Sequence, residues 1–329
     1  MLNRLLKMDY RRMWSVTGTL KERSHKSRLF LMRDMLFCAA RYNAGYMDYM
    51  IARMWELNDA QRKTVLTRGI NNQIVRRMNN RADWHAFDDK AAFNRAFAKW
   101  IPRGWIESDA SITKEKLAAF LEGKQTVFLK PIEGSSGVGV ERFTAADWQD
   151  LDAFTKKVRA AGKSIIEEGV VQHPRMAALN PGSVNTVRIS TLIGDKKEGI
   201  VYAFLRIGNG KVMDNVDCGG MAARVDLASG RLLTVAADKA GNVFTRHPIT
   251  GTEIIGFELP FFEEAKAMCL EAMRMVPSMR YIAWDVALTA DGPTLIEGNS
   301  FPSHAVPQFA AHYPDGIGIL PEFQKYIDI

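Results

Sequence analysis

The stretch from residue 281 to residue 300 constrains the fold most, because it has the pattern of two strands joined by a tight turn. Both arms are rich in apolar and β-branched residues, and Asp291-Gly292 between them is typical of a hairpin turn. Four apolar residues alternate along the first arm and therefore share one face: Ile282, Trp284, Val286 and Leu288. Asp285 lies on the other face, and Glu297 and Asn299 share a face of the second arm. If the turn folds the arms over each other, Asp285 lies opposite Glu297.

Two carboxylates and an amide on one open patch predict a magnesium site. Like charges this close repel each other unless a cation lies between them. Three hard oxygen ligands with room for water and phosphate are typical of Mg²⁺ completed by a nucleotide. The alternative is a solvent-facing hairpin with incidental acids, and the rest of the chain is needed to decide between the two.

Length and composition describe a soluble globular protein. The chain has 329 residues, which exceeds one ordinary domain, and a hydrophobic fraction of 47%. No apolar run approaches the ~20 residues that span a bilayer, and the first residues lack the apolar stretch of a signal peptide. Three distant cysteines without metal-type spacing, Cys38, Cys218 and Cys269, are expected to be free thiols in a reducing cytoplasm.

The positive charge of the chain is concentrated near its N-terminus. Residues 1–90 contain 18 Lys and Arg against 9 Asp and Glu, a balance of +9, and the remainder contains 26 against 28, a balance of −2. This quarter of the chain could meet an anionic lipid surface, nucleic acid or an acidic polymer. The alternative is a solvated helical face with no partner.

Residues 1–85 are predicted to be helical. Apolar residues recur at spacings of three and four, and no alternating, β-rich run appears before about residue 126. The arginines of this region fit the exposed sides of such helices, and no nucleic-acid-binding motif is present, so no nucleic-acid partner is expected. An all-helical, basic N-terminal region therefore precedes the rest.

After residue 85 the pattern changes to mixed helices and strands. Asp88 or Asp89 can cap a helix over residues 90–97, and a second helix is predicted over 112–121. Residues 126–131 have the pattern of a buried strand with Lys130 near its end. Lys90, at the start of the first helix, precedes Lys130 by about 40 residues.

A glycine-rich loop follows this strand at residues 133–140. Its three glycines and two serines provide backbone N–H groups that can face phosphate oxygens. It is neither a Walker A loop, because the required spacing fails, nor a dinucleotide fingerprint, because Arg142 replaces the third glycine. A plain β-turn is the alternative.

The remainder of the chain is predicted to be β-rich. A helix over 145–161 precedes a strand over 164–172 that ends in an acidic connector. Four further strands form an antiparallel meander, over 185–193, 199–207, 220–226 and 232–236. Helices are predicted over 263–275 and 320–326, on either side of the hairpin.

Between about residues 86 and 310, these parts together resemble an ATP-grasp enzyme. The resemblance implies that Lys90 and Lys130 bind the ATP phosphates and that residues 133–140 form a flexible lid. It also implies that residues 167–170 contact adenine and ribose and that the hairpin binds Mg²⁺. The implied nucleotide-binding residues are Lys90, Lys130, Ser135, Ser136, Gly137, Gly139, Glu167, Glu168 and Val170. The implied ligands of magnesium, with two ions expected, are Asp285, Glu297 and Asn299.

A narrower likeness is to the sugar-transfer-associated branch of the family. Several short segments carry it, including Ala203–Arg206, Asp214-Asn215, Gly219-Gly220, His247–Gly251 and Glu297–Asn299. Members of that branch tend to be encoded beside polysaccharide or cell-envelope glycosyltransferases. The expected fold class is therefore α+β: an ATP-grasp fold, with two α+β lobes gripping ATP, preceded by a helical region. The expected divisions are the helical region 1–85, a small lobe 86–170 and a large antiparallel-sheet lobe 171–329.

One departure limits what the resemblance implies about the substrate. Many ATP-grasp enzymes begin with a small parallel α/β domain that helps to bind the carboxylate, whereas the first 85 residues here are predicted to be helical. A substrate pocket therefore cannot be transferred from better-known relatives.

Further polar residues are assigned by the same resemblance. Arg188 and Arg206 are expected to clamp the carboxylate and stabilise the transferred phosphoryl group, or else to be structural partners of an acid. Residues expected to shape the acceptor side are Asn185, Asp214, Asn215, Gly219 and Gly220, of which Asn215, Gly219 and Gly220 are also expected to bind the nucleotide. Asn215 and the glycine pair could equally form a turn that only ends a strand. His247 is either a substrate-loop residue or a packing residue.

The implied activity is an ATP-dependent carboxylate–amine or carboxylate–nucleophile ligase that acts through an acyl phosphate in the modification of a polysaccharide or cell-envelope precursor. Two alternatives remain open: a sugar or small-molecule kinase on the same fold, and a non-catalytic nucleotide-binding scaffold that docks through its basic helices. The oligomeric state is not predicted.

Overall fold

The computed structural model describes residues 9–134, 137–211 and 214–329. The helices are α2 (Tyr10–Ser24), α3 (Arg28–Tyr42), α4 (Tyr46–Ile51), α5 (Asp59–Arg62), α6 (Arg68–Met78), α7 (His85–Asp88), α8 (Lys90–Ala96), α9 (Lys114–Leu121), α10 (Leu151–Ala160), α11 (Pro174–Leu179), α12 (Phe262–Ala272) and α13 (Leu320–Gln324). The strands are β1 (Trp105–Ser108), β2 (Thr126–Pro131), β3 (Glu141–Thr144), β4 (Ser164–Glu168), β5 (Thr186–Ile193), β6 (Glu198–Ile207), β7 (Met221–Arg224), β8 (Ala236–Ala237), β9 (Val243–Phe244), β10 (Tyr281–Thr289) and β11 (Gly292–Asn299).

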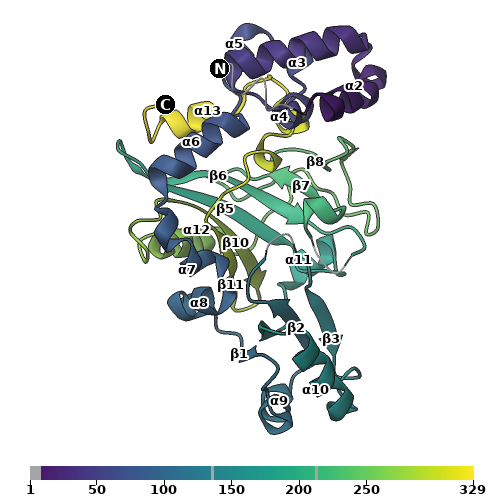
Figure 1. The fold of residues 1–329 in the computed structure, drawn as a ribbon, viewed down its shortest axis with the longest axis vertical. Helices are drawn as coiled ribbons and strands as arrows, with labels where there is room; N and C mark the ends of the chain where they lie inside the picture. The colour runs from purple at the N-terminus through teal and green to yellow at the C-terminus, as the bar shows by residue number, and fades with distance from the viewer. Residues whose placement is uncertain (1–8, 135–136, 212–213) are drawn as a thin grey trace.

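The strands form two antiparallel sheets, one in each of two lobes (Figure 1). The small sheet has the order β1-β4-β2-β3, and the large sheet has the order β11-β10-β5-β6-β7-β8-β9. The predicted meander and hairpin are thus confirmed as neighbours in one sheet. Helices α9 and α10 pack on the small sheet around Leu117, Phe154 and Val158.

Several predicted boundaries were wrong. Strand β1 was not predicted at all: it has only four residues, two of them polar, and it is paired with β4 from far along the chain. The helix predicted from residue 145 begins only at Leu151, where the Asp150 side chain accepts from the N–H of Ala153. Strand β4 ends at Glu168, not at residue 172, and β8 is confined to two residues because Leu232 pairs with Val225 only in an isolated bridge.

One face of the large sheet forms the main core with α12, α7 and α8. Trp284 of β10 is fully buried, and its ring contacts those of Phe87 and Phe97. The segment around α7 and α8 therefore packs on the large sheet although it precedes the small lobe in sequence. This packing explains why glycine separates Glu297 from Asn299: a Cβ at Gly298 would lie 2.8 Å from the Phe87 ring.

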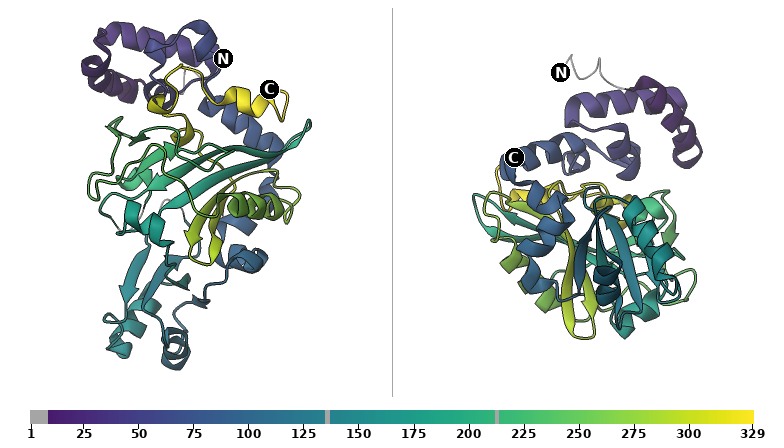
Figure 2. Two further views of the ribbon diagram at one scale, coloured as in Figure 1. Left: turned by 180° about the vertical axis from the view of Figure 1, so that it is seen from behind. Right: turned by 60° about the horizontal axis from the view of Figure 1, so that its bottom comes forward.

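The opposite face of the large sheet is covered at one end by α6 and the C-terminal segment, where Ile74, Tyr202 and Phe323 belong to one apolar cluster. Helices α2 to α4, with the segment that follows them, have a separate cluster that includes Met13, Leu31 and Met35. They form the end of the molecule opposite the small lobe, as the two further views also show (Figure 2). The helical N-terminal region is thus confirmed for its described residues.

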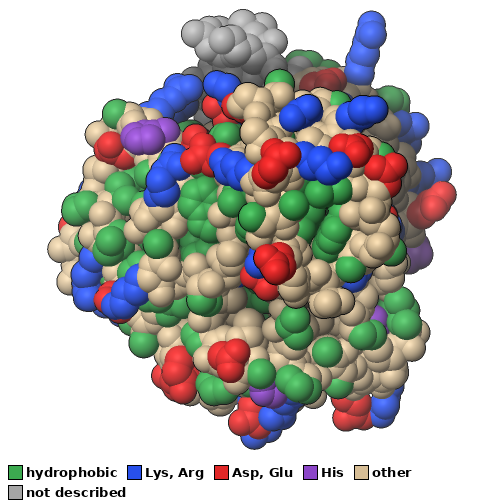
Figure 3. Space-filling view, turned by 90° about the horizontal axis from the view of Figure 1, so that it is seen from below, with side chains coloured by type: hydrophobic (Ala, Val, Ile, Leu, Met, Phe, Trp, Pro, Cys, Tyr) green, Lys and Arg blue, Asp and Glu red, His purple; other side chains and the backbone are tan. Residues whose placement is uncertain are grey.

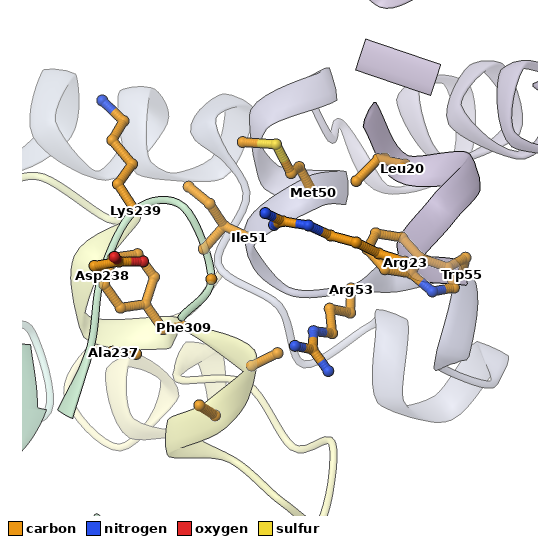
Figure 4. A pocket seen from close by; sticks show the side chains of 13 residues that line it. Leu20, Arg23, Met50, Ile51, Arg53, Trp55, Ala237, Asp238, Lys239 and Phe309 are labelled. Carbon is orange, nitrogen blue, oxygen red and sulfur yellow. The ribbon is translucent and has the colours of Figure 1, made fainter. Parts of the chain in front are cut away.

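A small cavity of about 40 Å³ lies where α2 and α4 meet the β8–β9 end of the large sheet (Figure 4). Arg23, Arg53, Lys239 and Phe309 are among the residues that line it. The cavity lies at the junction of the helical region with the large sheet. None of the described residues predicted to bind nucleotide or metal lines it.

The cysteines and the helices of the described residues agree with what the sequence predicted. Cys38, Cys218 and Cys269 are free thiols. Among the described residues, no helix combines the length and the apolar character that crossing a membrane requires.

Candidate functional site

The β10–β11 hairpin places the predicted metal ligands together. Asp285 pairs in register with Glu297, and Ala283 pairs with Asn299. The register shifts just after Asp285, but the predicted position of Asp285 opposite Glu297 is confirmed. Alternation along β10 sends Trp284 and Val286 into the main core and Asp285 to the other face.

Two arginines from neighbouring strands fill the space beside Asp285. Arg188, its direct partner on β5, donates from Nε and Nη2 at 2.6 and 2.5 Å, and Arg206 on β6 donates from Nη1 at 2.6 Å. Arg206 also pairs with Asp214 at 2.7 Å, and Asp214 accepts from the backbone N–H of Thr186. Burial alone would raise the pKa of Asp285, but Arg188 and Arg206 lower it to about 2.

Glu297 differs sharply from Asp285 in environment and charge state. Its side chain is 46% exposed, and its nearest guanidinium contact is Arg188 at 3.8 Å. Partial burial and the neighbouring Asp285 carboxylate, with which it shares a hydrogen bond, raise the pKa of Glu297 to about 7. One carboxylate of the pair is therefore neutralised by protein, and the other lacks a full counter-charge.

These donors fit a divalent cation. Asn299 donates from Nδ2 to the carbonyl of Ala283 at 3.0 Å, so its amide nitrogen is used within the hairpin and its amide oxygen is the atom that could bind a cation. Hard carboxylate and amide oxygens with open positions are suited to Mg²⁺. A cation beside Glu297 would relieve the charge repulsion that raises its pKa. Glu297 and Asn299 would supply two of the oxygens, and Asp285, whose two carboxylate oxygens both accept from arginines, would be the third ligand.

Lys130 and Glu167 form a buried ion pair at the junction of the two lobes. Lys130 contacts Glu167, which also accepts from Asn94 at 2.7 Å and from Arg103 at 3.2 Å. Burial opposes ionisation of Glu167, but Lys130 and Arg103 lower its pKa to about 2. Arg103 donates in addition to the carbonyl of Leu295 at 2.6 Å, so it joins β4 to the strand that carries Glu297. Arg103 and Asn94 were not predicted to belong to the site, and no local sequence pattern identifies either residue.

Lys90 lies between the hairpin and the glycine-rich loop. Asp89 caps α8 as predicted by accepting from the N–H of Ala92, and this sets Lys90 at the first position of the helix. The Lys90 ammonium donates to the carbonyl of Gly134 at 3.0 Å. Burial lowers the pKa of Lys90, and Glu297 is the strongest of the charges that act on it in the opposite sense. The structure thus brings Lys90 near both the loop and Glu297.

The glycine-rich loop joins β2 to β3. Gly137 and Gly139 have φ angles of 75° and 74°, which favour glycine, and a Cβ at Gly139 would lie 2.9 Å from Pro131. Ser135 and Ser136, which were predicted to contact phosphate, lie outside the described residues.

The acidic connector at the end of β4 makes its nearest contacts with the small lobe. Glu168 accepts from the backbone N–H of Gly104 at 3.2 Å and pairs with Lys124 at 3.4 Å. The N–H of Gly169 donates to Thr126, and Val170 is half-buried. Of the two predicted acidic side chains, Glu167 is buried against Lys130, and Glu168 is the more exposed.

The predicted acceptor-side residues make local structural contacts. Asn185 is buried and donates to the side chain of Gln172, and Asn215 caps a short turn by accepting from the N–H of Asp217. Gly219 has a φ of 95°, and a Cβ at Gly220 would lie 2.3 Å from the carbonyl of Asp214. His247 is also buried, with Nε2 2.8 Å from the carbonyl of Gly208 and Nδ1 accepting from two backbone N–H groups.

The two antiparallel lobes and the residues between them define an ATP-grasp fold. The family model described as "Sugar-transfer associated ATP-grasp" matches residues 69–324, and the chain belongs to this family. The match begins in α6, so α2 to α5 precede it.

Similar solved structures are ATP-grasp proteins of low sequence identity. The D-alanine–D-alanine ligase from Bacillus anthracis is 16% identical, with 78% of this chain and 73% of that chain covered and a TM-score of 0.45. The D-cycloserine synthetase DcsG is 14% identical, with coverages of 78% and 76% and a TM-score of 0.46. No curated protein matches the chain in a sequence search.

Proposed function

We propose that the protein is an ATP-dependent ligase that activates a carboxylate as an acyl phosphate and joins it to an amine or another nucleophile. The observation that carries the proposal is the environment of Glu297. This carboxylate lacks a full counter-charge, lies beside Asp285 and Asn299, and interacts electrostatically with Lys90. A metal ion bound together with a nucleotide would supply the positive charge that this carboxylate lacks.

The side chains at the lobe junction have distinct proposed roles. Lys90 and Lys130 neutralise the α- and β-phosphates, and backbone N–H groups of Gly137 and Gly139 approach the γ-phosphate and exclude water. Glu297, Asn299 and Asp285 hold Mg²⁺, for which we propose two ions. The metal supplies charge neutralisation at the β- and γ-phosphates. The connector at Glu168 and Val170 contacts ribose and adenine.

Arg188 and Arg206 are proposed to orient the acid substrate and the transferred phosphoryl group. Each guanidinium has five N–H donors, and the hydrogen bonds to Asp285 and Asp214 use two nitrogens of each arginine. The remaining donors can bind oxyanions while Asp285 keeps both side chains in place. We propose a sugar-linked or envelope precursor as one of the substrates; the description of the family as sugar-transfer associated supports the sugar-linked kind.

An ADP-release screen of carboxylic acids crossed with amines and amino sugars tests this function, with mass spectrometry of each hit. A ligase releases ADP and free phosphate only when both substrates are present, and the product gains the mass of both minus water. A kinase would leave the phosphate on its acceptor. ATP binding without turnover on any pair would support a nucleotide-binding scaffold instead.

The shifted pKa of Glu297 gives a separate prediction. We expect its carboxyl to titrate at about 7 in the metal-free protein instead of 4.5. The folded chain then retains a proton that the unfolded chain has lost, so the free energy of unfolding falls as the pH rises through this interval. Carboxyl-carbon NMR of glutamate-labelled protein measures the titration, and Glu297→Gln identifies the signal. Mg²⁺ with a non-hydrolysable ATP analogue should move the titration lower, and no movement would contradict metal binding by Glu297.

A further inference from the structure

Helices α2 and α3 expose large apolar side chains that are not used in their own core. Their buried residues, such as Met13, Leu20 and Leu31, already form a separate cluster. The exposed set, called here the helical patch, comprises Tyr10, Trp14, Leu29, Phe30 and Phe37, with exposed fractions between 42% and 65%. In the described chain, six aromatic side chains have exposed fractions of 37% or more, and four belong to this patch. Such a concentration marks an interaction surface.

The same two helices are strongly basic. Residues 9–42 contain eight Lys and Arg against three Asp and Glu. Two of the three acids already have partners: Asp9 accepts from the backbone N–H of Arg12 as the cap of α2, and Asp34 is paired with Arg62 at 2.8 Å. Arg11 and Arg33 are both exposed to solvent. The outer surface of the two helices is therefore cationic.

Two cations lie against aromatic rings of the helical patch. The Arg28 guanidinium lies 4.1 Å from the centroid of the Trp14 ring, and the Lys26 ammonium lies 5.7 Å from that of Phe30. These helices form the end of the molecule away from the small lobe (Figures 1 and 2). The opposite end, seen from below in Figure 3, presents acidic and basic side chains interspersed.

We propose that α2 and α3 dock the protein on an anionic bilayer surface. Trp, Phe and Leu side chains gain free energy at the boundary between headgroups and acyl chains, while neighbouring Lys and Arg bind anionic headgroups. Leu29, the most exposed of the patch, favours this occupant over nucleic acid, because a phosphate backbone offers no apolar medium for it. The inference rests on these helices alone and is independent of the proposed ligase activity.

Flotation of the full chain with lipid vesicles tests the proposal. We expect binding to phosphatidylcholine vesicles that contain phosphatidylglycerol, and little binding to phosphatidylcholine alone. The double variant Arg11→Gln/Arg33→Gln is expected to bind about 30-fold more weakly, since each basic residue at an anionic surface contributes about 1 kcal/mol. The matched control Lys116→Gln/Lys156→Gln, which removes two exposed charges from the small lobe, should bind as the wild type does.

The apolar contribution has its own variant. Trp14→Ser/Phe30→Ser is expected to weaken vesicle binding by at least about tenfold, because each buried aromatic contributes on the order of 1 kcal/mol or more. The matched control is Leu233→Ser/Ile249→Ser, two exposed apolar residues of the large lobe. Circular dichroism checks folding, and the arginine variant decides the question if the aromatic variant does not fold.

Three results would overturn the proposal. The first is no flotation with anionic vesicles, and the second is equal loss of binding in the lysine control. The third is retention of an oligonucleotide that competes with vesicles and depends on Arg11 and Arg33, which would assign the surface to nucleic acid. ADP release, measured in parallel, reports on the nucleotide site and is expected to be unchanged in all four variants.

Discussion

Replacing Glu297 with alanine is expected to abolish ATP turnover while the chain stays folded. The variant removes the carboxylate that lacks a full counter-charge, and loss of such an electrostatic contributor lowers kcat by about 10²- to 10³-fold or more. The stability of the folded protein, in contrast, should not fall. Above pH 7 the ionised Glu297 repels Asp285, so its removal is expected to leave the free energy of unfolding unchanged within about 0.5 kcal/mol, or to raise it. ADP release with an accepted substrate pair and urea denaturation measure the two effects.

A matched control separates this effect from a general loss of charge. Glu253 is an exposed carboxylate of the large lobe that pairs with Arg246, and Glu253→Ala should retain wild-type turnover. Activity near wild type in Glu297→Ala would remove Glu297 from the metal site. A large fall in stability would instead identify Glu297 as a structural residue.

The local pattern of the hairpin was sufficient to predict its geometry. The alternation of apolar residues assigned Asp285 to the face opposite Trp284, and the tight turn fixed which residues pair across the strands. Both properties depend on side chains close together in sequence, with the turn setting the register. For the same reason, the start of a helix at Lys90 was predicted correctly, and of the two candidate caps the structure uses Asp89.

The charge network around Asp285 could not be predicted in this way. Arg188 contacts Asp285 across 97 positions of sequence, and the contact depends on β5 lying next to β10 in the sheet. No local pattern specifies that strand order. Sequence analysis therefore named the arginines as candidates for binding substrate or for pairing with an acid, without identifying Asp285 as their partner.

The small lobe shows the same limit. An acidic side chain of the connector was predicted to contact the ribose, yet Glu167 is buried against Lys130 and Arg103. Arg103 lies in the short segment before β1, a strand too short and too polar for its pattern to be recognised. Where two distant segments meet, charge pairing decides which residues are available to a ligand.

Replacing Asp285 with alanine is expected to destabilise the protein strongly, in contrast to Glu297→Ala. Asp285 is buried and accepts three hydrogen bonds from Arg188 and Arg206, so its removal leaves guanidinium charge in the interior without its main partner. Breaking a buried pair in this way costs about 3–5 kcal/mol. The midpoint of urea denaturation of the large lobe, followed by tryptophan fluorescence, measures the loss.

Two further variants decide whether unpaired charge is the cause. Asp217→Ala breaks an exposed pair with Lys239 on the same lobe and should cost no more than about 1 kcal/mol. Arg188→Met in the Asp285→Ala background removes one stranded charge and should restore part of the lost stability, so the double-mutant cycle should give a coupling of about 1 kcal/mol or more. If Asp285→Ala costs no more than Asp217→Ala, the arginines do not depend on Asp285, and the site is held by other contacts. Opposite stability changes at Asp285 and Glu297 would show that the fold depends on the Asp285 carboxylate and not on that of Glu297.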